Sequence, residues 1–206
     1  MVKNSETVEP TEKTDDSIIM FPNLFGDPSS RKVISIYGEI NEECATVATM
    51  ELFMMRGASC SQEDVSGSAS PIEAIISTEG GNVQDMFSIY DCMRSIRKDV
   101  EIETFGVGKV MSAGILLLSG GTPGKRKIGR NCRLMLHAVA GGHFGSLKEL
   151  ETDIREVRWY QDRLIKALVE ETKLEYKELK SIFRKKTDTY FDAEQAVEWG
   201  IADEVV

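Results

Sequence analysis

A serine stands among small residues where an apolar strand is expected to turn into a helix. Residues 106–114 read G-V-G-K-V-M-S-A-G, with Ser112 directly before Ala113. At a helix N-terminus, free backbone N–H groups and the helix dipole stabilise a developing negative charge. A nucleophile benefits from that position, because the oxyanion that it creates needs donors nearby. The pattern also fits a serine that only caps a helix, with glycines for close packing.

A histidine at the end of another apolar strand is the candidate base. His137 follows the stretch 133–136. Serine is a weak nucleophile until a base accepts its proton, and histidine titrates in the appropriate range. Sites in open parallel sheets form at the carboxyl ends of strands. We therefore expect His137 to be the base, rather than His143, which follows a Gly-Gly pair in an extended loop. The alternative is a histidine whose hydrogen bonds are satisfied in the core.

An aspartate and a glycine pair complete the set of candidates. The carboxylate of Asp188 is of the kind that fixes a histidine tautomer and stabilises the imidazolium. However, most of the 34 acidic residues are expected to be solvated. Gly80 and Gly81 follow a strand, and glycines let backbone N–H groups approach a ligand closely; an ordinary strand-to-helix turn explains them as well. The order Ser, His, Asp does not discriminate, because triads occur in several orders.

Alternating strands and helices are expected to position these residues. Over the first two-thirds of the chain, apolar runs alternate with apolar residues at helical spacing, which is typical of a parallel sheet with crossover helices. Strands are expected at 33–38, 72–77, 100–105, 133–136 and 201–206. Helices are expected at 42–56, 83–96, 111–118, 147–172 and 175–183, with a short one capped at 192–195, and a long loop at 57–70.

Composition limits the class of protein. The chain has 206 residues, 41% of them hydrophobic, which is enough for one domain with a core. Its net charge of -9 disfavours nucleic acid as a partner, because an acidic surface repels phosphate. No apolar stretch approaches the roughly 20 residues of a membrane helix. Because no secretory signal is seen, the four cysteines are expected to be reduced thiols in a cytoplasm-like compartment. Two histidines are too few for a multi-histidine metal site.

Several motifs together resemble the proteolytic-subunit (ClpP) family of the Clp protease, a family of serine peptidases. The resemblance runs from about residue 33 to residue 206, apart from the loop at 57–70. The similar segments are 88–91, 111–117 with 124–126 (the nucleophile segment), 131–137 (the histidine segment, N-C-R-L-M-L-H), and 188–203 (the aspartate segment). Any one of these motifs is unspecific, whereas the set is specific.

The resemblance assigns roles to the candidate residues. By it, Ser112 is the nucleophile, His137 the general base and acid, and Asp188 the orienting carboxylate. The oxyanion donors are the backbone N–H groups of Gly81 and Ala113. No cofactor is implied in this chain.

The resemblance also implies a fold and an assembly. The fold is an α/β, crotonase- or ClpP-like spiral of strand-strand-helix turns in residues 18–206. The polar, acidic composition of residues 1–17 separately indicates a flexible arm. A protruding handle at about 141–172 interlocks two seven-membered rings into a chamber. A separate AAA+ unfoldase of the ClpX, ClpA or ClpC type uses ATP and feeds unfolded polypeptides into that chamber. No nucleic acid or membrane is involved. The location is cytoplasmic, or an organelle stroma or matrix, or the host cytoplasm if a phage encodes the chain.

The sequence departs from the family pattern in three places. The family's N-S-P-G-G reads S-T-E-G-G at 77–81, which removes a rigid proline and adds the carboxylate of Glu79 near the oxyanion donors. Ala113 stands where the family has methionine, which reshapes the pocket for the residue before the scissile bond. The family's D-x-Y-S-R-L-L run is replaced by N-L-F-G-D at 23–27, which argues against docking of a standard unfoldase.

Three functions are therefore weighed. The first is a serine endopeptidase subunit that acts through an acyl-enzyme inside a closed chamber. The second is a catalytically weak or inactive ring subunit with a structural or regulatory role. The third is a crotonase-like acyl-CoA enzyme, which shares the fold but relies on backbone oxyanion donors and needs no Ser/His pair.

Overall fold

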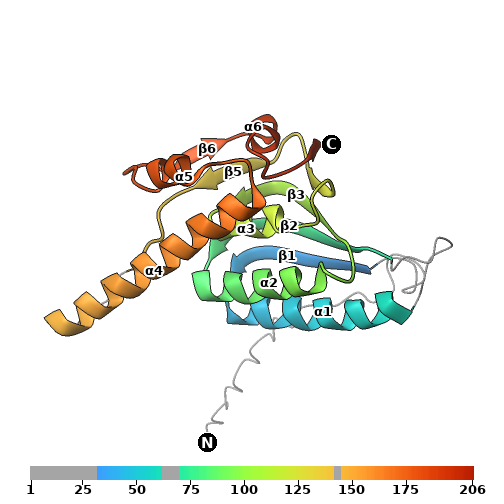
Figure 1. The fold of residues 1–206 in the computed structure, drawn as a ribbon, viewed down its shortest axis with the longest axis horizontal. Coiled ribbons are helices and arrows are strands. Elements are labelled where there is room, and N and C mark those ends of the chain that lie inside the picture. The colour runs from blue at the N-terminus through green and yellow to red at the C-terminus, as the bar shows by residue number, and fades with distance from the viewer. Residues whose placement is uncertain (1–31, 62–69, 142–144) are drawn as a thin grey trace, which may run out of the picture. The chain divides into compact units, whose positions relative to one another are not determined.

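The computed structural model describes residues 32–61, 70–141 and 145–206 of the chain. Figure 1 shows this part as a mixed α/β unit in which helices surround a central sheet. The expected acidic arm at 1–17, the start of the domain at residue 18, the segment at 23–27 and the competing base His143 lie outside the described residues.

A mainly parallel sheet forms the centre of the described part. The strands follow the order β1-β2-β3-β4-β7, and β5 pairs with both β3 and β6. Every pair is parallel except β5–β6. The parallel sheet with crossover helices, predicted from the alternation of patterns, is confirmed. The strands are β1 (Lys32–Ile40), β2 (Ile72–Gly81), β3 (Ile102–Met111), β4 (Arg126–Ile128), β5 (Arg133–Leu136), β6 (Thr189–Phe191) and β7 (Glu204–Val205).

Helices connect the strands and cover the sheet. Figure 1 shows α1 and α2 side by side next to β1, and α4 extending out from the body. All seven residues of α3 are buried, so the residue before this helix is attached to an element of the core. The helices are α1 (Glu42–Ser61), α2 (Val83–Ile96), α3 (Ala113–Ser119), α4 (Leu147–Glu171), α5 (Tyr176–Ile182) and α6 (Ala193–Glu198).

The long helix α4 is anchored at one end only. Ser146 and Glu149 form a capping box at its start, which satisfies N–H groups that have no partner within the helix. The buried residues of α4, from Leu164 to Glu171, all lie in its C-terminal part. Leu147 and Ile154, in its N-terminal part, are exposed. The helix therefore projects from the core. It begins at residue 147, so the first part of the predicted handle at 141–172 precedes the helix.

Several predicted element ends are wrong near the glycines. Strand β3 continues through 106–108 to Met111, so this Gly-Val-Gly segment is strand rather than turn. The register between β2 and β3 shifts after Ile76, and Gly108 takes a φ of 66° that absorbs the irregularity. Strand β2 likewise runs to Gly81. Helix α1 continues to Ser61, into the predicted loop at 57–70. The short strands β4 and β6 were not predicted, because three residues carry too little pattern.

A buried ion pair connects β4 to the end of the chain. Arg126 Nε and Nη2 donate to the two Asp203 carboxylate oxygens at 2.8 and 2.6 Å. The backbone N–H groups of Gly124 and Arg126 donate to the same carboxylate. Burial alone would raise the pKa of Asp203, but these hydrogen bonds and the Arg126 charge outweigh it and hold that pKa below its usual range. Arg126 Nη1 also donates to the Glu171 carbonyl oxygen, so the pair holds the C-terminal end of α4 as well.

Replacing Asp203 by asparagine tests this ion pair. We expect Asp203→Asn to lower the free energy of unfolding by about 3–5 kcal/mol at pH 7, because the buried Arg126 loses its charged partner. Since folding lowers the pKa of Asp203, the wild-type advantage is fully present above the unfolded carboxyl pKa of about 4. It disappears as the pH falls through the lower folded value. Urea unfolding at pH 3 and pH 7 measures the difference, with the exposed Asp91→Asn as control. The same deficit at both pH values would contradict the assignment.

Candidate active site

Ser112 lies in a sharp, strained turn between β3 and α3. Its φ is 53° and its ψ is -117°, and no other non-glycine residue in the described part has a positive φ. Such a conformation costs about 1–3 kcal/mol and persists only where neighbours hold it. The Ser112 N–H donates to the Met135 carbonyl at 2.8 Å, and the Ser112 carbonyl accepts from the Ile115 N–H at 3.1 Å. A strand-to-helix elbow of this kind exposes a serine hydroxyl.

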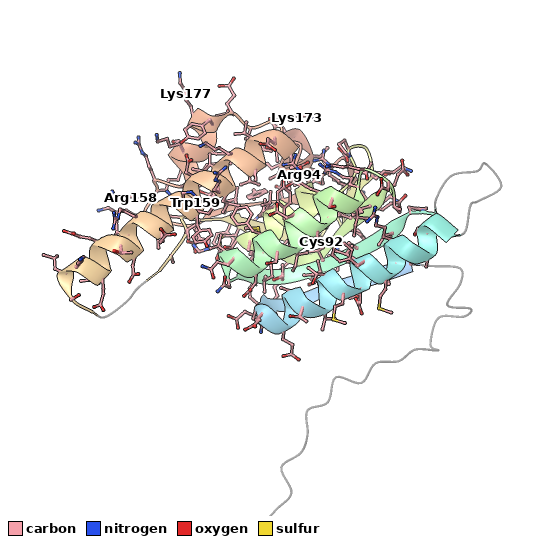
Figure 2. All side chains as sticks on the ribbon, turned by 60° about the horizontal axis from the view of Figure 1, so that its bottom comes forward. Cys92, Arg94, Arg158, Trp159, Lys173 and Lys177 are labelled. Atoms are coloured by element: carbon pink, nitrogen blue, oxygen red, sulfur yellow. The ribbon has the colours of Figure 1, made fainter. Side chains whose placement is uncertain are left out.

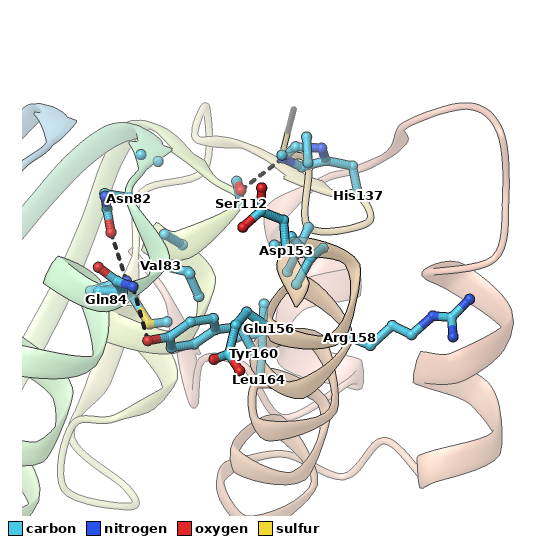
Figure 3. Close-up of a pocket in the computed structure, with 18 of the residues that line it drawn as sticks. Asn82, Val83, Gln84, Ser112, His137, Asp153, Glu156, Arg158, Tyr160 and Leu164 are labelled. Carbon is cyan, nitrogen blue, oxygen red and sulfur yellow. Dashed lines mark hydrogen bonds between the residues drawn. The ribbon is translucent and has the colours of Figure 1, made fainter. Parts of the chain in front are cut away.

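His137 meets this serine from the neighbouring strand. Strand β5 runs parallel to β3 with Met135 opposite Met111, so the two strands deliver the histidine and the serine at the same edge of the sheet. His137 Nε2 lies 2.8 Å from Ser112 Oγ, although the residues are 25 positions apart (Figure 3). With the ring proton on Nδ1, Ser112 Oγ donates to Nε2, which is the arrangement that a general base requires.

Asp188 directly precedes the strand that pairs with β5, but in the described part of the chain its side chain makes no hydrogen bond or ion pair with His137. In the antiparallel pair β5–β6, Leu136 is opposite Thr189. One further step of this register brings Asp188 opposite His137. The Asp188 side chain is exposed, and no hydrogen bond or ion pair joins these two described residues. The structure thus brings Ser112 and His137 together and leaves the carboxylate of Asp188 apart from them.

The junction between β2 and α2 at residues 79–84, called the glycine turn below, packs directly against the serine. A methyl group built on Gly80 would lie 2.7 Å from Ser112 Cβ and 3.1 Å from the Ala113 nitrogen. Because only glycine fits here, the turn can approach the first residue of α3 closely. Gly81 follows, with a φ of 155° in the region that favours glycine. Ala113 directly follows Ser112, and Gly81 directly follows Gly80, which contacts Ser112. The N–H groups of Gly81 and Ala113, the two proposed oxyanion donors, therefore both come from residues near the serine.

A buried threonine, missed in the sequence, supports this turn. Thr78 is fully buried; its hydroxyl donates to the Gly38 carbonyl and accepts the Gly80 N–H at 2.9 Å. On the other side of Gly81, the Asn82 N–H donates to the Ile40 carbonyl at 2.8 Å. Both neighbours of Gly81 are thereby fixed. Sequence offered no signal for this role beyond a hydroxyl near the glycine pair.

An open cleft of about 1180 Å³ contains both reacting side chains. Ser112, Ala113, His137 and Gly81 line it, between the turn at 79–84 and helix α4. Figure 3 shows α4 facing that turn across the cleft. Asp188 is not among the lining residues. The cleft is large enough for several residues of a peptide, since drug-sized ligands occupy about 300–1,000 Å³.

Contacts between α4 and α2 border the cleft. Tyr160 Oη accepts a hydrogen bond from Gln84 Nε2 at 2.9 Å (Figure 3). The Tyr160 ring stacks on Phe87 with 6.4 Å between ring centroids. These contacts connect the middle of α4 to the first turns of α2.

The carboxylate that replaces the family proline has a charged partner. Glu79 Oε2 lies 2.7 Å from Lys109 Nζ, and both side chains are about half exposed. The hydrogen bond from Lys109 lowers the pKa of Glu79. Glu79 therefore adds a paired charge rather than a free one beside the glycine turn. Lys109 comes from β3, the strand that ends directly before Ser112.

The described cysteines do not compete as nucleophiles. Cys44, Cys92 and Cys132 are free thiols, and burial raises the pKa of each, that of Cys132 to about 11. The thiolate is the reactive form of cysteine, and it is scarce at neutral pH under these conditions. In the part of the chain that the structure describes, no helix is long and apolar enough to cross a bilayer, and no three His, Cys, Asp or Glu side chains form a metal-binding group.

A serine–histidine pair at a strand–helix elbow, open to a large cleft, defines a hydrolase-like α/β site. The family model for Clp protease matches residues 22–206. The chain is also similar to the solved structure of a point mutant of ClpP1 from Listeria monocytogenes. That similarity has 26% identity and a TM-score of 0.73, over 85% of this chain and 91% of that one. The chain belongs to the Clp protease family, and the ClpP-like α/β fold expected from its motifs is confirmed.

The close contact at Gly80 can be tested by adding one methyl group. We expect Gly80→Ala to lower the free energy of unfolding by about 2–4 kcal/mol, from left-handed strain and from overlap with Ser112. Gly124→Ala is the matched control: its φ of 86° is close to the 96° of Gly80, but nothing lies within 4 Å of the added methyl group. It should lose only about 1 kcal/mol. Equal losses in denaturant unfolding would show that the turn does not press on Ser112.

Proposed function

We propose that this chain is a serine endopeptidase subunit that hydrolyses unfolded polypeptides. The observation that carries the proposal is the 2.8 Å hydrogen bond between His137 Nε2 and Ser112 Oγ inside the cleft. Membership of the Clp protease family supports peptide bonds as the substrate and argues against the acyl-CoA alternative.

Each residue near the serine has a defined step in the proposed reaction. Ser112 Oγ attacks the peptide carbonyl carbon while His137 Nε2 takes its proton. The tetrahedral oxyanion accepts hydrogen bonds from the N–H groups of Gly81 and Ala113. The C–N bond then breaks, the leaving amine takes the proton from His137, and an acyl-enzyme remains. A water molecule, deprotonated by His137, attacks the acyl carbonyl and releases the carboxylic product and Ser112.

Asp188 is proposed to orient His137 after a small rearrangement. The register between β5 and β6 supports this role, because one step beyond the pair of Leu136 and Thr189 would bring Asp188 opposite the histidine. Accepting the Nδ1–H of His137 would fix the tautomer in which Nε2 is the base. Since the carboxylate is exposed and makes no contact with His137, this step requires the side chain to turn towards the imidazole.

The proposed working form is a pair of stacked seven-membered rings. The projecting part of α4 supports this assembly, because Leu147 and Trp159 expose 75% and 50% of their surface. Figure 2 shows Trp159 on this helix. Apolar side chains in such a position are suited to contact another copy of the chain. In this proposal a separate AAA+ unfoldase uses ATP to deliver unfolded polypeptide, and this chain needs no cofactor. We propose a cytoplasm-like location.

The second candidate function is a catalytically weak or inactive ring subunit. The observation that favours it is the missing contact between Asp188 and His137. A site without an oriented imidazole loses much of its rate, since the wrong histidine tautomer costs about 10⁴-fold in a serine protease. The two functions make opposite predictions for labelling by an active-site reagent.

Replacing the nucleophile separates these two functions. Wild-type protein should react with a fluorophosphonate probe and should cleave a fluorogenic peptide. Ser112→Ala should abolish labelling and lower kcat by at least about 10³-fold, because the hydrogen-bonded hydroxyl is the reacting group. Ser88→Ala, an exposed serine on α2, is the control and should retain both activities. Wild-type protein that neither labels nor cleaves, although assembled, would support the inactive subunit.

Replacing the aspartate tests the third member of the site. If Asp188 orients the imidazole during the reaction, Asp188→Asn should lower kcat by about 10²–10⁴-fold and leave KM nearly unchanged. Circular dichroism should show an intact fold, because the side chain is exposed. Asp91→Asn serves as the control for charge loss elsewhere. An Asp188→Asn variant with wild-type kcat would mean that Ser112 and His137 act as a dyad.

A further inference from the structure

The cleft that contains Ser112 has an unusual balance of charge. Its lining includes four carboxylates, of Glu39, Glu79, Asp153 and Glu156. Arg158 is the one cationic side chain among the described lining residues. Figure 3 shows Arg158 directed away from Ser112. Apolar side chains make up much of the remaining surface: Val83, Met86, Leu136, Val139, Leu150, Ile154, Val157 and Leu164.

These carboxylates come from both walls of the cleft. Glu79 directly precedes Gly80, and Glu39 is opposite Gly80 in the register between β1 and β2. Asp153 and Glu156 lie about one turn apart on α4, so they share a face of that helix. A chain that passes Ser112 between the glycine turn and α4 therefore runs between acidic side chains.

Two of these carboxylates have no compensating charge from the described part of the protein. Glu79 has its partner Lys109 at 2.7 Å. Glu39 and Glu156 are exposed, and neither makes a hydrogen bond or an ion pair with another described residue. Because these two carboxylates lack a cation from that part of the chain, a cation on a bound ligand meets no competitor there.

We propose that this cleft selects polypeptide segments that carry lysine or arginine beside the bond to be cleaved. This inference rests on the proposed function and names the substrate class for that site. Glu39 on one wall and Glu156 on the other attract a basic side chain and repel an acidic one. The apolar lining favours lysine and arginine in particular, because these residues bury their aliphatic stems while the charged end reaches a carboxylate.

The preference for basic segments is expected to be modest, because Glu39 and Glu156 are exposed to solvent. Each exposed ion pair contributes little, so we expect about a threefold effect per carboxylate and about tenfold for both together. Screening by salt weakens interactions between exposed charges. The selection is therefore strong at low ionic strength and weak at high ionic strength, unlike selection by an apolar pocket.

Matched peptides measure the preference directly. Three fluorogenic peptides of equal length carry leucine at the cleaved position, flanked by lysine, glutamine or glutamate. We expect kcat/KM to fall in that order, with lysine about tenfold above glutamate in low salt and less at about 0.5 M NaCl. In the double variant Glu39→Gln/Glu156→Gln the ratio should fall below about twofold. The control Glu151→Gln/Glu204→Gln removes two exposed charges outside the cleft and should keep the wild-type ratio.

A binding measurement keeps this inference separate from the proposed function. In Ser112→Ala, fluorescence anisotropy should show tighter binding of the lysine peptide than of the glutamate peptide. Hydrolysis without a preference, or a preference that survives in Glu39→Gln/Glu156→Gln, would overturn the inference and leave the peptidase proposal intact. Selective binding of the lysine peptide without hydrolysis by the wild type would support the inference about charge and overturn the peptidase proposal. Equal binding together with no hydrolysis would overturn both.

Discussion

The geometry of the Ser112–His137 site depends on the close contact between Gly80 and Ser112, which leaves no room for a methyl group on Gly80. Gly80 approaches Ser112 so closely that any Cβ would overlap it, and Ser112 itself holds the one strained non-glycine backbone in the described part. The strain is maintained from three sides: by the Met135 carbonyl, by the buried helix α3, and by a glycine turn fixed through Thr78. A serine held in this way cannot relax into an ordinary helix cap. Its hydroxyl is therefore kept in front of His137, where the two atoms are 2.8 Å apart.

Much of this arrangement was predictable from the sequence, because strand ends in a parallel sheet meet at one edge. Ser112 follows β3 and His137 follows the adjacent β5. The sequence indicated a strand-to-helix turn at Ser112 and a strand end at His137, although it ended the first of these strands at residue 105. The ends of β2 and β3 were not predictable, since glycines inside them read as turns while the ladder continues through a shifted register. The antiparallel pair β5–β6 was also missed, because three-residue strands have no periodicity to detect. That pair decides where the backbone of residue 189 lies, and no sequence pattern encodes the exposed position of the Asp188 side chain before it.

The grouping of acidic residues in the cleft could not be predicted from the sequence, for a different reason. Glu39, Asp153 and Glu156 have no distinguishing pattern in the sequence, where they are three of 34 acidic residues. They become a group only when α4 folds across the turn at 79–84, which is a tertiary contact. Glu79 could be singled out by comparison with the family pattern, but its pairing with Lys109 could not, because the ladder between β2 and β3 brings the two residues together.

The two ends of helix α4 have different roles: the C-terminal end contributes to the stability of the fold, and the N-terminal part shapes the cleft. At its C-terminal end, Glu171 is buried, where its carboxylate accepts hydrogen bonds from Tyr90 and Arg97 and its carbonyl accepts one from Arg126. Breaking that cluster would leave buried charges unpaired, so this end is fixed by the same interactions that stabilise the fold. The N-terminal part contributes Leu150 and Asp153 to the cleft, and the buried residues of the helix begin only at Leu164. The C-terminal end of α4 therefore contributes to the stability of the fold, whereas its N-terminal part forms one wall of the cleft.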